Sequence, residues 1–256
     1  MEPSKDDLAQ EMHEAYVQHK AGRLAEAAGR WKADPAEPHI LTFSGPLETR
    51  PHRFCPSPTV PGADCPNCKK PLLHLLSLQT DQLPFWTEPS PSAFHLLYCW
   101  ICAIPFDLFS YRIRQDGGVE VLQYLDRSSD SIGPGGPYEG YTGMFPESRV
   151  GLRALSAEEQ CIARQLVVGG EGPEEYRYLT EPVHQIGGFP LICNAYEVQC
   201  PSCDQAAPFF ATICNNAAGH GYTHDSLLTF AGFCSLHMIF HWCASCAVMT
   251  AYHSCD

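Results

Sequence analysis

Eight of the fourteen cysteines occur as four Cys-x-x-Cys pairs, and the arrangement of the pairs repeats. The first copy combines a pair at 65–68 with one at 99–102, and the second combines a pair at 200–203 with one at 243–246. A tight turn can aim both thiols of a pair at one point, so two pairs can form the closed tetrahedral site that structural Zn²⁺ prefers. The sequence therefore predicts two zinc sites, formed by Cys65, Cys68, Cys99 and Cys102, and by Cys200, Cys203, Cys243 and Cys246.

Disulfide bonds and redox dithiols are the main alternative uses for these cysteines. Residues 1–7 are polar and acidic and lack the apolar core of a secretory signal, so we expect a cytoplasmic protein with reduced thiols. No run of eighteen apolar residues is present, so no membrane-spanning helix is expected. Four pairs in two matching copies favour metal binding over a single redox dithiol.

The other six cysteines lie outside the pairs, and we interpret most of them as small buried apolar residues. Cys55, Cys255 and His253 lie near the pairs and are alternative ligands by position. His241, two residues before the last pair, is expected to form a hydrogen bond near the metal site or to face the other side of its strand. The six cysteines are Cys55, Cys161, Cys193, Cys214, Cys234 and Cys255.

The segments that flank the pairs also repeat. Residues 94–98 and 238–242 are apolar and run into the second pair of each copy, whereas residues 71–76 and 208–213 follow the first pair and begin with Pro. Pro is tolerated at the first residue of a strand, so all four segments are predicted as buried strands. We call the turn that holds each Cys-x-x-Cys pair a knuckle. Each copy then consists of a knuckle, a strand, a long connecting segment, a second strand and a second knuckle, and this repeated order indicates an internal duplication.

The predicted fold class is α+β, a β-rich internal duplication with two four-cysteine zinc sites and an N-terminal helical segment. The expected divisions are an N-terminal helix or helical hairpin over 1–38 and a first zinc-bearing repeat over 39–125. A linker with a short helix over 126–182 and a second zinc-bearing repeat over 183–256 complete the chain.

Local patterns predict several further elements. Apolar side chains recur at three- and four-residue spacing over 5–31, which predicts a helix that Gly22 can divide in two. Residues 106–113 and 119–124 are predicted to form two strands, joined by a hairpin turn at Asp116-Gly117-Gly118.

Loops and turns are equally visible in the sequence. Residues 39–64 contain five Pro and are expected to be extended or turn backbone, and 126–147 is rich in Gly, Pro and Ser, which is typical of a linker. Residues 156–167 are predicted as a short helix that begins at Ser156. The two glycines within 184–190 indicate a backbone that needs unusual dihedral angles or close packing.

The net charge limits the kinds of partner. Sixteen basic and 29 acidic residues give a formal charge of −13. Phosphate backbones are bound by basic surfaces, so nucleic-acid binding is disfavoured. An acidic surface is complementary to a basic protein partner, although solubility alone would also explain the charge.

One loop offers an alternative function. His220, His224 and Asp225 lie within the Gly-rich segment 219–225 and could hold a third, catalytic metal in a metal-dependent hydrolase. The simpler interpretation is a surface turn with solvated histidines. The sequence has no His-Glu-x-x-His, nor the His-x-Glu followed by Pro-Cys-x-x-Cys that is typical of zinc deaminases.

Several motifs together resemble a known family. Residues 184–190 (His-Gln-Ile-Gly-Gly-Phe-Pro), the pair at 200–203, the Phe-rich strand after it and residues 240–246 (Phe-His-Trp-Cys-Ala-Ser-Cys) resemble the bacterial YwqG-like proteins. More distantly they resemble the eukaryotic programmed-cell-death-two proteins, which share a duplicated domain with that group. The resemblance is clearest over about 183–250 and weaker over about 44–124, where only Gly45-Pro46 corresponds to the paired glycines.

The resemblance implies a duplicated, β-rich α+β fold with no established enzymatic activity. Its eukaryotic members act as chaperones or adaptors for a basic ribosomal protein, and some bacterial members look like immunity proteins. Many bacterial members lack a full set of cysteines, so the metal sites are predicted from this sequence alone. We therefore expect a zinc-stabilised protein-binding module, of the chaperone, adaptor or immunity type, with no catalysis.

Overall fold

A computed structural model describes residues 37–57, 60–86, 91–99, 102, 107–125, 147–167, 184–191, 197–214 and 236–255. The predicted N-terminal helix over 5–31 and the His-rich loop 219–225 lie outside these ranges, as does nearly all of the predicted linker 126–147.

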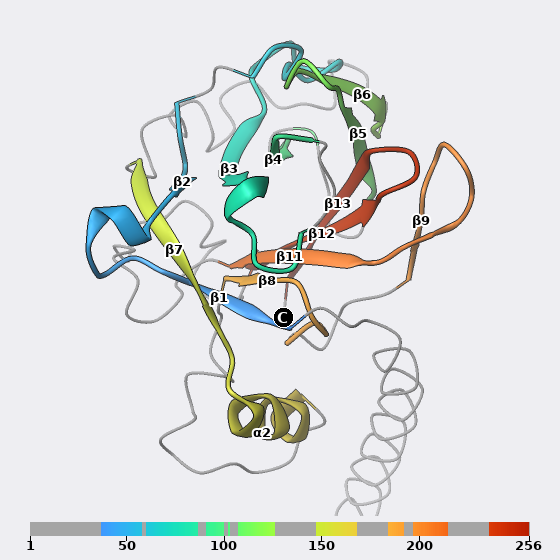
Figure 1. Ribbon diagram of the computed structural model, residues 1–256. Coiled ribbons are helices and arrows are strands. Elements are labelled where there is room, and N and C mark those ends of the chain that lie inside the picture. The colour runs from blue at the N-terminus through green and yellow to red at the C-terminus, as the bar shows by residue number, and fades with distance from the viewer. Residues whose placement is uncertain are drawn as a thin grey trace, which may run out of the picture.

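The described part of the chain is mostly β-structure, dominated by one eleven-stranded sheet (Figure 1). Its strand order is β4-β3-β2-β7-β1-β8-β11-β12-β13-β5-β6, and every neighbouring pair is antiparallel. The strands are β1 (His39–Thr42), β2 (His52–Phe54), β3 (Leu73–Gln79), β4 (Ala93–Tyr98), β5 (Phe109–Ile113), β6 (Val119–Gln123), β7 (Ser148–Ala154), β8 (Gln185–Ile186), β11 (Phe209–Cys214), β12 (Leu236–Cys243) and β13 (Val248–Cys255). The remaining elements are the hairpin β9 (Val198–Gln199) and β10 (Ala206–Ala207), the short 3-10 helices η1 (Leu47–Thr49) and η2 (Thr80–Gln82), and the helix α2 (Ala157–Val167).

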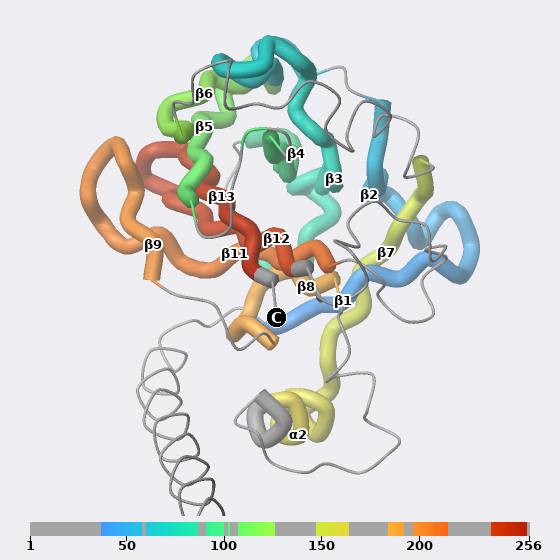
Figure 2. The backbone as a smooth tube through the Cα atoms, turned by 180° about the vertical axis from the view of Figure 1, so that it is seen from behind, coloured from blue at the N-terminus to red at the C-terminus, as the bar shows by residue number. Residues whose placement is uncertain are grey.

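The sheet curls strongly, so that its end strand β4 packs against β5 and β13 (Figures 1 and 2). Side chains join these strands where backbone pairing is not continuous. The Tyr111 hydroxyl donates to the carbonyl oxygen of His95 (2.6 Å) and accepts from the Leu97 N–H (2.9 Å). The Tyr98 hydroxyl lies 2.7 Å from Nδ1 of His253 on β13. These buried bonds hold β4 inside the ring of strands.

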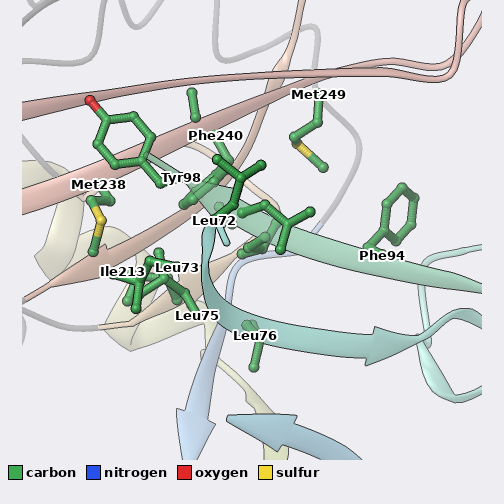
Figure 3. Packing of buried hydrophobic residues seen from close by; sticks show 14 of the residues in the cluster. Leu72, Leu73, Leu75, Leu76, Phe94, Tyr98, Ile213, Met238, Phe240 and Met249 are labelled. Carbon is green, nitrogen blue, oxygen red and sulfur yellow. The ribbon is translucent and has the colours of Figure 1, made fainter. Parts of the chain in front are cut away.

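One apolar core fills this ring (Figure 3). Leu75 and Phe94, from strands that follow and precede the first two cysteine pairs, share it with Met238, Phe240 and Met249 from the C-terminal strands. All five side chains are fully buried. The segments predicted as two repeats, 39–125 and 183–256, therefore contribute to a common core.

One strand from each half of the chain, β1 and β7, lies next to strands of the other half. β1 lies between β7 and β8, and β7 lies between β1 and β2. Counted outward from the β7–β1 junction, the sheet continues with β2, β3 and β4 on one side and β8, β11 and β12 on the other. Four strands on one side of this junction thus correspond to four on the other, whereas β13, β5 and β6 extend the sheet beyond β12 only.

Most of the local predictions in the described ranges are confirmed. The four segments that flank the pairs are β3, β4, β11 and β12, and residues 106–124 contain the β5–β6 hairpin. The short helix α2 begins after Ser156, which forms a reciprocal capping box: Glu159 N–H donates to Ser156 Oγ (3.1 Å) and Ser156 N–H to Glu159 Oε2 (2.6 Å). The segment 126–182, expected to hold a linker and a short helix, also contains β7, and β13 was not predicted.

The paired glycines require unusual backbone angles, as predicted. Gly187 and Gly188 have φ angles of +69° and +68°, and a Cβ on Gly188 would lie 2.6 Å from Cβ of Pro38. The buried Gln185 amide fixes this turn, because its Nε2 donates to the carbonyl oxygens of Gly187 (2.8 Å) and Phe189 (2.6 Å). The turn thereby packs closely against the residues that lead into β1.

His74 is a buried polar residue in this sheet. It lies on β3 with 7% of its surface exposed, and neither ring nitrogen has a hydrogen-bond partner among the described residues. Burial lowers its pKa to about 3, and the nearby charges of His95 and Arg53 act in the same direction. The folded protein therefore holds His74 neutral, whereas the unfolded chain protonates it below its usual pKa of 6.5.

We predict that His74→Leu makes the fold less sensitive to acid. Because the pKa of His74 is lowered by folding, its neutral ring costs stability as the pH falls from 6.5 towards 3, by about 1.4 kcal/mol per pH unit. The difference in unfolding free energy between His74→Leu and wild type should grow in favour of the variant between pH 6 and pH 4. Urea unfolding at several pH values measures this difference, and a difference that does not change with pH would contradict the prediction.

Candidate metal centres

The first pair of each copy lies in a turn with the same hydrogen bonds. In both turns the backbone N–H of the first Cys donates to the carbonyl oxygen five residues later, and its carbonyl oxygen accepts from the backbone N–H four residues later. The residue after the second Cys has a positive φ in both, +57° at Lys69 and +56° at Asp204. The bonds are Cys65 N to Lys70 O (2.9 Å) and Lys69 N to Cys65 O (2.9 Å), and Cys200 N to Gln205 O (2.8 Å) and Asp204 N to Cys200 O (2.9 Å).

The second pair of each copy is positioned by the end of a long strand. Cys99 follows β4 directly, and Cys243 is the last residue of β12. Cys246 lies in the turn between β12 and β13, and this turn closes with Ala247 at a φ of +53°. The antiparallel pairs β3–β4 and β11–β12 bring the turn before the first strand next to the turn after the second.

The structure brings the eight predicted residues together in two groups of four. Within each group all sulfur atoms lie within 4.8 Å of one another. The Sγ–Sγ distances are 3.7 Å for Cys65–Cys102, 3.8 Å for Cys68–Cys99 and 3.8 Å for Cys203–Cys243. A tetrahedral site with metal–sulfur bonds of about 2.3 Å requires sulfur atoms about 3.8 Å apart, whereas a disulfide requires about 2.05 Å. The spacing fits four ligands around one metal ion.

The thiols of the first cluster differ in how easily they ionise. A hydrogen bond from Cys99 lowers the pKa of Cys65 to about 5, and the same bond, together with burial, raises the pKa of Cys99. Burial and the neighbouring sulfur charges raise the pKa of Cys102 to about 12. A buried group of four thiols therefore favours one thiolate, and a divalent cation is needed to stabilise the others.

In the second cluster, too, the pKa of one thiol is lowered and that of another is raised. Burial opposes ionisation of Cys243, but hydrogen bonds from the Ser245 hydroxyl (3.2 Å) and the Cys246 N–H outweigh it and lower the pKa to about 7. Burial raises the pKa of Cys200 to about 12, although the Ser202 N–H points at its sulfur (3.5 Å). Donors to the sulfur atoms thus come from the residues between the paired cysteines, a contribution that the Cys-x-x-Cys spacing alone does not reveal.

The other suggested ligands lie outside both groups as far as the structure describes them. Cys55 is buried, and its backbone N–H donates to Leu75 O (2.9 Å). His253 Nδ1 is occupied by Tyr98, as described above. His241 Nδ1 lies 3.0 Å from the carbonyl oxygen of Ala207 in β10, so it forms the expected hydrogen bond beside the second cluster. The side chain of Cys255 is not described.

The residues suggested for a hydrolase, His220, His224 and Asp225, lie outside the described residues. Among the described residues, the two cysteine clusters are the groups that could hold a metal ion.

Neither protein-family models, nor curated proteins, nor solved structures give a match to this chain. None of the helices in the described ranges has the length and apolar character needed to cross a membrane.

We predict that Cys200→Ser removes one metal ion per chain and destabilises the fold. Three thiolates leave an open coordination position, and metal binding in such sites contributes directly to folding free energy, so a loss of about 3 kcal/mol or more is expected. Elemental analysis and urea unfolding of the purified variant measure both effects.

Cys161→Ser is the matched control, because Cys161 is an exposed cysteine on α2 outside both clusters. It should retain the wild-type metal content and stability. Equal metal content in Cys200→Ser and wild type would contradict the assignment of Cys200 as a ligand.

Proposed function

We propose that this protein is a zinc-stabilised module that binds a basic protein partner, and that its two metal ions are structural. The observation that carries the proposal is the pair of four-cysteine clusters, in each of which all sulfur atoms lie within 4.8 Å of one another. The proposed ligands are those predicted from the sequence.

Zinc is the metal that such sites fit best. Soft thiolate ligands in tetrahedral geometry select Zn²⁺ or iron–sulfur centres, and a site in which two Cys-x-x-Cys turns converge on one point is typical of structural zinc. A site with four protein ligands is closed, whereas a catalytic zinc keeps one position open for water or substrate. This closed geometry supports a structural role over a hydrolytic one.

Internal duplication is part of the proposal. The two knuckle turns share the same hydrogen bonds and a positive φ at the following residue, and four strands on each side of the β7–β1 junction follow a matching order. These features support a duplicated unit whose copies exchange a strand. The resemblance to the YwqG-like and programmed-cell-death-two proteins points to the same arrangement and to a chaperone, adaptor or immunity role.

A basic partner is supported by charge. The chain has a formal charge of −13, and each zinc with four thiolates would add about two further negative charges. Each ion pair in the described residues joins one acidic and one basic side chain, so these pairs leave the net charge unchanged. A net negative charge attracts and orients a basic protein.

We predict that the zinc-loaded chain retains a basic protein whose binding weakens with salt. The tagged full-length chain is exposed to a cell extract at 50 mM and at 500 mM NaCl, and the retained proteins are identified and purified for affinity measurements. The expected partner has a net positive charge and binds at least about tenfold more weakly at high salt, because charge attraction is screened.

The metal-stripped chain is the control for this experiment and should bind the purified partner more weakly, because the proposed zinc holds the binding fold. Retention of no protein, or of partners without positive charge, would contradict the proposal.

A further inference from the structure

A small cavity opens beside the first cysteine cluster. It lies between the knuckle turns and the β5–β6 hairpin, and three cysteines of the cluster line it together with Asp107, Phe109 and Tyr124. Two leucines complete the wall. Its enclosed part has room for about one group the size of a water molecule. The second cluster has the same four-sulfur geometry, but none of its cysteines lines this cavity.

Asp107 brings an unsatisfied acceptor to this cavity. Its Oδ2 is buried, and no described residue donates a hydrogen bond to it. A buried carboxylate oxygen without a donor has lost its hydrogen bonds to water without replacement, which destabilises the folded protein. A native site therefore calls for a donor from outside the described residues, and the donor must fit the small enclosed space.

The surrounding charge selects a cationic donor. Four thiolates around one Zn²⁺ carry a net charge of about −2, and Cys65, Cys99 and Cys102 present this charge to the cavity that Asp107 shares. Among the residues that the structure describes, no basic side chain lines the cavity. Arg112 and Arg114 of the neighbouring hairpin are paired with Glu120 and Asp116. Anions are repelled from such a site and a cation is attracted.

The shape and the rim favour an ammonium group on an aliphatic stem. An ammonium is about the size of a water molecule, whereas a planar guanidinium is larger than the enclosed space. Tyr124, with 37% of its surface exposed, and Phe109 supply aromatic surface at which a cation is further stabilised. The rim is also fixed in place, because Asn67 of the first knuckle donates through Nδ2 to the carbonyl oxygen of Leu125.

We infer that this cavity receives a lysine side chain of the protein partner, with its ammonium group bonded to Asp107 Oδ2. The inference rests on the proposed function and identifies where the basic partner is recognised. The zinc ion has an added role in it, because the charge of the metal–thiolate cluster attracts the partner's cation.

The test uses the zinc-loaded full-length chain and three capped tripeptides, Gly-Lys-Gly, Gly-Arg-Gly and Gly-norleucine-Gly. Binding is followed by NMR through the backbone amide signals of Leu108, Tyr124 and Leu125. The lysine peptide should shift these signals and bind at least about tenfold more tightly than the norleucine peptide, which keeps the stem but lacks the charge. The arginine peptide should bind more weakly than the lysine peptide.

Asp107→Asn is the decisive variant, because the amide keeps the shape and removes the charge. It should keep the wild-type zinc content and bind the lysine peptide about tenfold more weakly. Glu48→Gln is the matched control: it removes one negative charge from an exposed residue of η1 and should bind as wild type does.

Equal binding of the lysine and norleucine peptides, absence of shifts at the cavity, or unchanged affinity in Asp107→Asn would each overturn the inference. Its failure is distinguishable from failure of the proposed function. A purified basic partner that binds wild type and Asp107→Asn equally well would support the proposed function while placing its recognition elsewhere on the surface.

Discussion

The rest of the structure depends on one constraint, which is that two turns bring four thiols together in each cluster. Each cluster joins the turn before one strand to the turn after the strand that pairs with it, in β3–β4 and again in β11–β12. Sulfur atoms held within 4.8 Å of one another cannot all ionise unless a cation lies between them. Metal binding and the closure of these strand pairs are therefore one event in this account.

The curled sheet couples the two clusters. β1 and β7 each pair with strands from the other half of the chain, and Phe94, Phe240 and Met249 fill a core to which both halves contribute. Opening of one cluster would loosen a strand pair that packs on this common core. The common core therefore links the two clusters, and Asp107, which precedes β5, lies beside the first of them.

The sequence predicts the elements that local chemistry determines. The Cys-x-x-Cys turns, the Asp116-Gly117-Gly118 hairpin, the start of the helix at Ser156 and the positive-φ turn at Gly187-Gly188 all depend on residues close in sequence. β7 was not predicted, although its apolar residues Val150, Leu152 and Ala154 alternate with Arg149, Gly151 and Arg153 as they do in a strand. Its pairing with β1 and β2 could not be predicted from this alternation. The order of strands and the placement of Asp107 beside the first cluster depend on long-range pairing, which periodicity does not encode.

The central claim is that each cluster holds one zinc ion in a reduced, folded chain. Elemental analysis of protein purified without a metal-affinity tag, combined with thiol counting under denaturing conditions with and without chelator, tests it most directly. The account predicts two zinc ions per chain and about eight thiols that become reactive only when the chelator removes the metal. Protein that contains no metal and has disulfides in place of those thiols would contradict it.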